Sequence, residues 1–128
     1  MSEQTLNSYL QQCCRDHGFV SIVVADNTGM MLAHQGDPID DAFVAHLPVW
    51  LAAGDRVSEM GGLGGAACCC VVPENRSSLM LAWSEDRVNG EGVYLAVLTR
   101  SLPPRLSATL KDIAQSVCQL VDRATLLT

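Results

Sequence analysis

Three consecutive cysteines, Cys68 to Cys70, shortly follow four glycines that fall within five residues, Gly61 to Gly65. Cysteine thiolates bind zinc and act as nucleophiles in redox enzymes. Glycine-rich turns hold phosphate groups, because backbone N–H groups can approach a ligand closely there. This stretch therefore suggests three possible functions: metal binding, thiol chemistry and phosphate binding. Each requires a particular residue spacing and particular neighbouring elements.

The glycines lack the setting that phosphate binding requires. A P-loop continues with a lysine and a hydroxyl residue, whereas Gly65 is followed by Ala66, Ala67 and Cys68. A dinucleotide-binding turn follows a strand and opens a helix, but here a predicted helix comes first and a predicted strand follows. We interpret the glycines as a flexible connection between the two and expect no cofactor.

The cysteines lack the spacing of metal ligands. Zinc sites use cysteines two to four residues apart, completed by a second pair or by histidines. Neighbouring residues of a strand point to opposite faces, so Cys68 and Cys70 share one face and Cys69 takes the other. We interpret all of them as small core residues and predict no metal site. A thiol-based redox sensor or enzyme using the Cys68–Cys70 cluster stays open as an alternative.

The histidines also give no catalytic set. His17 and His34 stand at the ends of predicted elements, and His46 is the one polar residue of an apolar helix, where we expect it to be buried or at an interface. Neither a nucleophile elbow nor a zinc-protease motif is present. We predict no catalytic residues and a protein that is not an enzyme.

Size and charge narrow the class of protein. The chain has 128 residues, of which 48% are hydrophobic, so we expect a single domain over residues 1–128. A net charge of −6 argues against nucleic acid and anionic membranes as partners. The N-terminus has no secretory signal, and the longest apolar run, residues 42–53, is too short to span a bilayer. We expect a soluble, cytoplasmic protein without membrane insertion.

Hydrophobic spacing and turn residues predict the elements. A first helix starts at Leu6 and ends near Gly18, and a second is capped by Asp40 and kinked at Pro48. A last helix opens at Pro103-Pro104. Strands are expected over residues 19–25, 30–34, 66–72, 78–84 and 93–99. The predicted fold class is α+β, a five-stranded antiparallel sheet with helices on both faces, in the order α-β-β-α-β-β-β-α.

The second helix and the strand after it carry little charge. A helical face is marked by Phe43, Leu47, Trp50, Leu51 and Val57, and the first four are expected to cover the sheet, yet the other side is also apolar. The strand at residues 66–72 is uncharged on both faces, unlike a protected edge. We therefore predict a homodimer whose interface contains Val44, Ala45, Pro48, Val49, Ala52, Ala66, Ala67, Cys68, Cys69, Cys70, Val71 and Val72.

The chain resembles the roadblock/dynein light chain superfamily over about Leu6 to Val121. The resemblance is carried by the element order, the segment VSIVVADNTGMMLA, the alanine-rich middle helix, and the strand VYLAVL before a long last helix. It implies a profilin-like, roadblock architecture and a homodimer in which the third strand and middle helix of each chain meet. Bacterial members are similar to regulators of small Ras-like GTPases. Pro48 and the cysteine triplet depart from the pattern.

Four functions are consistent with these features of the sequence. The leading hypothesis is a non-enzymatic homodimeric regulator or scaffold that binds a small Ras-like GTPase or a related signalling protein. The alternatives are a secretion-type chaperone that binds an effector segment, the thiol-based sensor or enzyme, and a ligand sensor, which would need a cavity. The chaperones place three strands before the middle helix, whereas this sequence predicts two.

Overall fold

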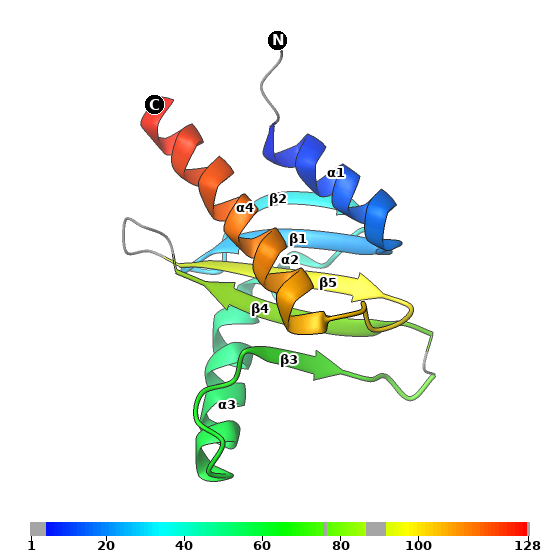
Figure 1. Ribbon diagram of the computed structural model, residues 1–128, viewed down its shortest axis with the longest axis vertical. Helices are drawn as coiled ribbons and strands as arrows, with labels where there is room; N and C mark the ends of the chain where they lie inside the picture. Colours follow the sequence, from blue (N-terminus) through cyan, green and yellow to red (C-terminus); the bar gives the residue numbers. More distant parts are fainter. Residues whose placement is uncertain (1–4, 76, 87–91, 128) are drawn as a thin grey trace.

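The computed structural model describes residues 5–75, 77–86 and 92–127 (Figure 1). Along the chain the elements are α1 (Leu6–His17), β1 (Ser21–Asp26), β2 (Met31–Gly36), α2 (Asp41–Ala45), α3 (Leu47–Met60), β3 (Cys68–Val71), β4 (Leu79–Glu85), β5 (Val93–Thr99) and α4 (Leu106–Leu127). The predicted order is confirmed, with the middle helix divided in two.

The five strands form one antiparallel sheet in the order β2-β1-β5-β4-β3. Helices α1 and α4 cover one face of the sheet, and α2 and α3 lie on the other (Figure 1). The predicted α+β class, with helices on both faces, is therefore confirmed. Strands β2 and β3 are the two edges of the sheet.

Alternation along the strands divides the core into two clusters. The side that we call the α1/α4 face is built around Leu10, Leu81, Leu95, Val97 and Val117. The α2/α3 face is built around Val23, Val44, Leu47, Leu51, Cys69, Ala82 and Ala96. Successive strand residues point to opposite faces, so both surfaces of the inner strands are apolar, as a sheet covered on both sides requires.

Local sequence signals fix the first half of the fold. Thr5 caps α1 in a capping box with Ser8, and Gly18 ends the helix in the left-handed conformation (φ 69°). In the β1–β2 turn the carboxylate of Asp26 accepts hydrogen bonds from Thr28 N (2.9 Å), Thr28 Oγ1 (2.6 Å) and Met30 N (3.0 Å). The predicted helix end and hairpin turn are thus both present.

The middle helix is broken rather than kinked. Asp40 caps α2 as predicted, accepting from Ala42 N at 2.8 Å, but α2 ends at Ala45 and α3 starts at Leu47. Pro48 stands in the first turn of α3, where its missing N–H would have no helical partner. The prediction of a kink inside one helix was wrong because proline here opens a new helix.

The last helix begins later than predicted. Pro103 and Pro104 precede α4 instead of forming its first turn, and Arg105 between them and the helix has a positive φ of 51°. That conformation interrupts a right-handed helix. Thr109 Oγ1 donates to the carbonyl oxygen of Pro104 at 2.9 Å, which holds the turn against the start of α4.

Helix α3 crosses the sheet and continues beyond its β3 edge (Figure 1). It packs on β3, β4 and β5. A Cβ atom at Gly54 would overlap the sulfur of Cys69, so glycine lets α3 approach β3 closely. Asp55 Oδ1 accepts from Ala66 N at 2.7 Å and joins the helix to the chain entering β3. Among the described residues, no helix is long and apolar enough to cross a membrane.

Candidate functional site

The cysteine triplet alternates between the two faces of the edge strand, as predicted. Cys69 is buried in the α2/α3 face, while Cys68 packs partly against the α1/α4 face. Cys70 is exposed. Burial, with a smaller contribution from the neighbouring cysteines, raises the pKa of Cys68 to about 11, and burial and Asp55 also raise the pKa of Cys69. Neither thiol is activated as a nucleophile at neutral pH.

Ser21 and His34 form a polar contact that was not predicted from the sequence. The hydroxyl of Ser21, a fully buried residue, donates to the carbonyl oxygen of Asp37 at 2.8 Å. His34 Nε2 lies 2.7 Å from the same oxygen and 3.2 Å from Ser21 Oγ. A carbonyl oxygen only accepts, so Nε2 carries the proton and cannot also receive one from serine. The pair fastens β1 and β2 to the following loop rather than forming a nucleophile and base.

The other two histidines are structural as well. His46 is exposed in the single chain, so it is not buried there, and a place at an interface stays a prediction. Its Nδ1 lies 2.6 Å from the carbonyl oxygen of Ala42, so the ring provides a hydrogen-bond partner for a carbonyl group near the end of the short α2. The ring of His17 stacks on Phe19 with centroids 5.1 Å apart. His46 is held by a hydrogen bond and His17 by stacking, and the two rings do not share a catalytic site.

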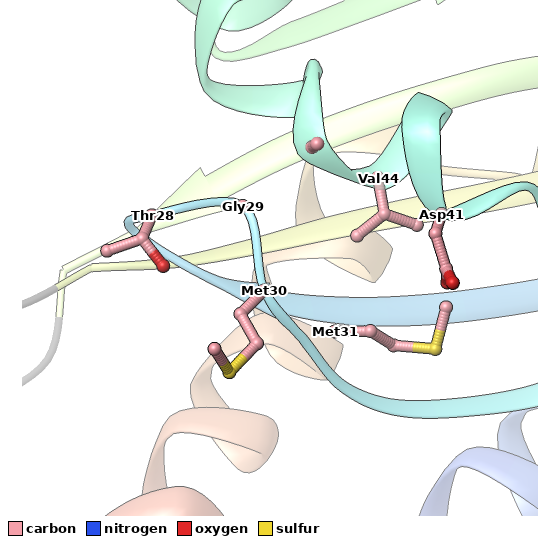
Figure 2. A pocket seen from close by; sticks show the side chains of 7 residues that line it. Thr28, Gly29, Met30, Met31, Asp41 and Val44 are labelled. Carbon is pink, nitrogen blue, oxygen red and sulfur yellow. The ribbon is translucent and has the colours of Figure 1, made fainter.

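An open hollow of about 490 Å³ lies where the β1–β2 turn meets α2. In Figure 2 the side chain of Met31 extends toward Asp41, while Met30 points away from both. Thr28, Gly29, Val44 and Ala45 complete the lining. Asp41 is its one ionisable side chain, so the hollow offers apolar contact but no acid–base or nucleophilic pair.

A second hollow, beside α4, is acidic. It is lined by Glu85, Asp86, Gln115, Cys118, Gln119 and Asp122. Within the described residues, no group of three or more histidine, cysteine or acidic side chains is arranged to hold a metal ion. Both hollows therefore give weaker indications of function than the surface around β3.

Exposed apolar residues gather on the β3 edge and on the outer side of α3. On β3 and the residue after it, Val71 is 48% exposed and Val72 59%. On α3 the exposed apolar residues follow helical spacing, namely Val49, Ala52, Ala53, Val57 and Met60, and Leu63 follows in the loop. We call these residues and β3 the edge surface; Arg56 is the one charged side chain inside this stripe.

Two residues of the predicted interface lie in the core instead. Val44 is 1% exposed and belongs to the α2/α3 face, where it packs in one cluster with Leu47 and Leu51, three and seven residues later. Cys69 is 8% exposed beneath α3. Ala45, Val49, Ala52, Ala67, Cys70, Val71 and Val72 are exposed, and Pro48, Ala66 and Cys68 are half-buried.

Three exposed apolar residues were missed or misplaced by the sequence reading. Val57, expected on the same helical face as Leu47 and Leu51, is 71% exposed, and Met60 and Leu63 are 85% and 81% exposed. The spacing of Val49, Ala53, Val57 and Met60 gives an i, i+4, i+8, i+11 stripe, which groups Val57 and Met60 on one side of the helix, whereas Leu63 follows in the loop. Large apolar patches of this kind are typical of protein-binding surfaces.

No protein-family model and no curated protein matches the sequence. Solved structures do match. Myxococcus xanthus MglB superposes with a TM-score of 0.68 at 12% identity, covering 92% of this chain and 95% of that one. A Roadblock/LC7 domain from Streptomyces avermitilis gives 0.64 at 21% identity, covering 98% and 100%.

A structure of MglB with a tetrameric arrangement gives a TM-score of 0.65 at 18% identity, covering 91% of this chain and 87% of that one. These likenesses extend over nearly the whole chain, and they agree with the element order and sheet described above. The chain has the Roadblock/LC7 fold.

Proposed function

We propose that this protein is a non-enzymatic homodimeric regulator or scaffold that binds a small Ras-like GTPase or a related signalling protein. The observation that carries the proposal is the uncharged, exposed β3 edge beside an apolar outer face of α3. The Roadblock/LC7 fold supplies the context, because the superfamily resemblance implies dimers joined through this strand and helix.

The β3 edge is better suited to pairing than the edge at β2. Helix α1 packs on β2, and His34 and Gln35 place polar side chains there. Residues 66–72 carry no charge that would oppose pairing with another strand. A two-fold axis beside β3 would pair it with its own copy and give a sheet continuous across both chains.

Helix α3 supports the same arrangement. Its last turns extend past β3 (Figure 1), so they would lie over the sheet of a second copy. Val71, which shares the α2/α3 face with Cys69, is exposed where that helix would arrive. Val57 and Met60 are then covered by the second copy, which explains apolar side chains that would otherwise stay in water.

The kind of partner rests on the resemblance. Bacterial members of the superfamily are similar to regulators of small Ras-like GTPases, and one structure of this fold is an MglB with a tetrameric arrangement, which supports self-association in the fold. We assign no arginine finger and no catalytic residue, so the proposed action is binding. The proposal includes a cytoplasmic location, where such GTPases act.

The chaperone alternative fits the fold less well. Two strands, β1 and β2, precede the middle helices, as in the roadblock order, whereas the secretion chaperones are expected to have three. The thiol-enzyme alternative is weakened because burial raises the pKa of Cys68 and Cys69. The ligand-sensor alternative would have to use an open hollow with one ionisable side chain.

A nucleotide-dependent pull-down tests the proposal. The purified chain is immobilised and exposed to native lysate that contains either GDP or a non-hydrolysable GTP analogue. We expect a small GTPase, identified by mass spectrometry, that is retained several-fold better in one nucleotide state, and its binding is then measured with the purified pair. Retention of an unfolded effector, or no GTPase in either state, would contradict the proposal.

A further inference from the structure

Cys70 differs from the other five cysteines of the chain in being exposed. Cys13, Cys69 and Cys118 are buried, and Cys14 and Cys68 are half-buried. Cys70 pairs with Leu81 of β4 and shares the α1/α4 face with Cys68. Helix α4 packs on β4 and β5. The thiol of Cys70 therefore stands on the edge strand, outside the part of the face that the helix covers.

The proposed homodimer restricts which residues can face one another across its axis. A two-fold axis that pairs antiparallel edge strands in one sheet is perpendicular to that sheet, so every side chain stays on its own face. Directly opposed residues must also share a face. Because faces alternate along a strand, two opposed residues are either both even-numbered or both odd-numbered. No register therefore places Cys69 opposite Cys70.

Two registers keep the β3 strands well overlapped. The middle of β3 lies between Cys69 and Cys70, so the axis passes through one or the other. With the axis at Cys70, that residue faces its own copy. With the axis at Cys69, Cys70 faces Cys68 of the second copy. In both registers Cys70 is opposite a cysteine.

The spacing of opposed strand residues suits a disulfide. Opposed Cα atoms in antiparallel sheets are about 4.5–5.5 Å apart, and disulfides span about 4.4–6.8 Å between Cα atoms. Cys68 is the poorer partner, because it is half-buried and its sulfur lies 3.7 Å from the carbonyl oxygen of Cys69 in its own chain. Cys70 is therefore the better partner for a disulfide, and the bond would need the register in which Cys70 meets Cys70.

We propose that Cys70 forms a disulfide with Cys70 of the second copy when the dimer meets hydrogen peroxide. The inference rests on the proposed homodimer, and it adds a modification site and a register. Such bonds in a reducing compartment are transient and act in redox sensing. The covalent link would make the dimer independent of protein concentration.

The chemistry takes two steps. One Cys70 thiolate attacks an oxygen of hydrogen peroxide, which breaks the O–O bond and gives a sulfenic acid and, after protonation, water. The second Cys70 thiolate attacks the sulfenic sulfur, the S–S bond forms, and the hydroxyl leaves and is protonated to water. Two thiols lose two electrons, and the peroxide is reduced to two molecules of water.

Non-reducing electrophoresis of peroxide-treated protein tests the inference. Wild type and the Cys68→Ser/Cys69→Ser variant, which keeps Cys70, should give a band at twice the chain mass of 13.7 kDa that dithiothreitol removes. Cys70→Ser should lose this band. Persistence of the band in Cys70→Ser, or its absence from wild type, would overturn the inference.

Two controls separate the possible failures. The single variant Cys68→Ser should cross-link like wild type, and loss of its band would overturn the Cys70–Cys70 register even if the double variant misfolds. Sedimentation under reducing conditions measures the dimer independently. A reduced monomer would contradict the proposed function, whereas a reduced dimer without a peroxide-dependent band would contradict this inference alone.

Discussion

Gly54 is a residue whose role depends on one neighbour. Glycine inside a helix normally costs about 1 kcal/mol relative to alanine, yet a Cβ here would overlap the sulfur of Cys69. We expect Gly54→Ala to destabilise the fold by about 1–3 kcal/mol through overpacking. Denaturant unfolding of the two proteins measures this difference.

The matched background is Cys69→Ala, which removes the overlapping sulfur. In that background Gly54→Ala should become neutral or stabilising, since only the helix preference remains. A Gly54→Ala protein that is more stable than wild type while Cys69 is present would show that the helix and strand are not in close contact.

Asp26 is a second residue with a defined effect, in the β1–β2 turn. Slight burial raises its pKa, but hydrogen bonds from Thr28, Met30 and Gly29 outweigh this and lower the pKa below 3.8. A group with a lowered folded pKa stabilises the fold above its unfolded pKa and loses that contribution as the pH falls. We expect Asp26→Ala to cost about 1 kcal/mol at neutral pH.

The pH dependence distinguishes charge from packing. The difference in unfolding free energy between wild type and Asp26→Ala should be constant above about pH 5 and shrink as the pH falls from about 4 through the lowered folded pKa. Chemical denaturation at several pH values measures it. A difference that stays unchanged down to pH 2 would rule out the carboxylate as its source.

At the scale of elements, the sequence predicted the turns and helix ends that depend on neighbouring residues. The hairpin turn at Asp26–Gly29 and the end of α1 at Gly18 have strong local signals, and both are present. The break at His46 was not predicted, because apolar residues at helical spacing continue through it. The late start of α4 depends on the positive φ of Arg105. Arginine does not favour that conformation, so the residue type gave no indication of it.

Pro48 tests the divided middle helix. Proline in the interior of a helix costs about 3 kcal/mol, whereas proline in a first turn costs little and restricts the unfolded chain. We therefore expect Pro48→Ala to leave stability unchanged or lower it by up to about 1 kcal/mol, as measured by thermal or urea unfolding. A gain of about 3 kcal/mol would indicate one continuous, strained helix.

At the scale of the whole molecule, lack of charge at residues 66–72 predicted an uncharged edge strand, and β3 is an edge of the sheet. The sequence placed Val44 and Cys69 on the interface side, but the structure buries both. It also missed Met60 and Leu63. Spacing along α3 groups Met60 with Val49 and Val57, but it does not show that this part of the helix extends beyond the sheet, because that depends on the strand order.

A charge on the β3 edge should prevent association of the two chains. Val71→Glu places a carboxylate on the β3 edge, where a second copy would bury it, and an unpaired buried charge is strongly unfavourable. Leu102→Glu is the matched control, because Leu102 is similarly exposed (54% against 48%) and lies in the segment between β5 and α4, outside the edge surface.

The most direct test is the mass of the reduced protein by sedimentation equilibrium at micromolar concentration. The account predicts twice the chain mass of 13.7 kDa for wild type and for Leu102→Glu, and the single chain mass for a folded Val71→Glu. A wild-type protein that is monomeric, or a Val71→Glu variant that stays dimeric, would contradict a homodimer joined through β3.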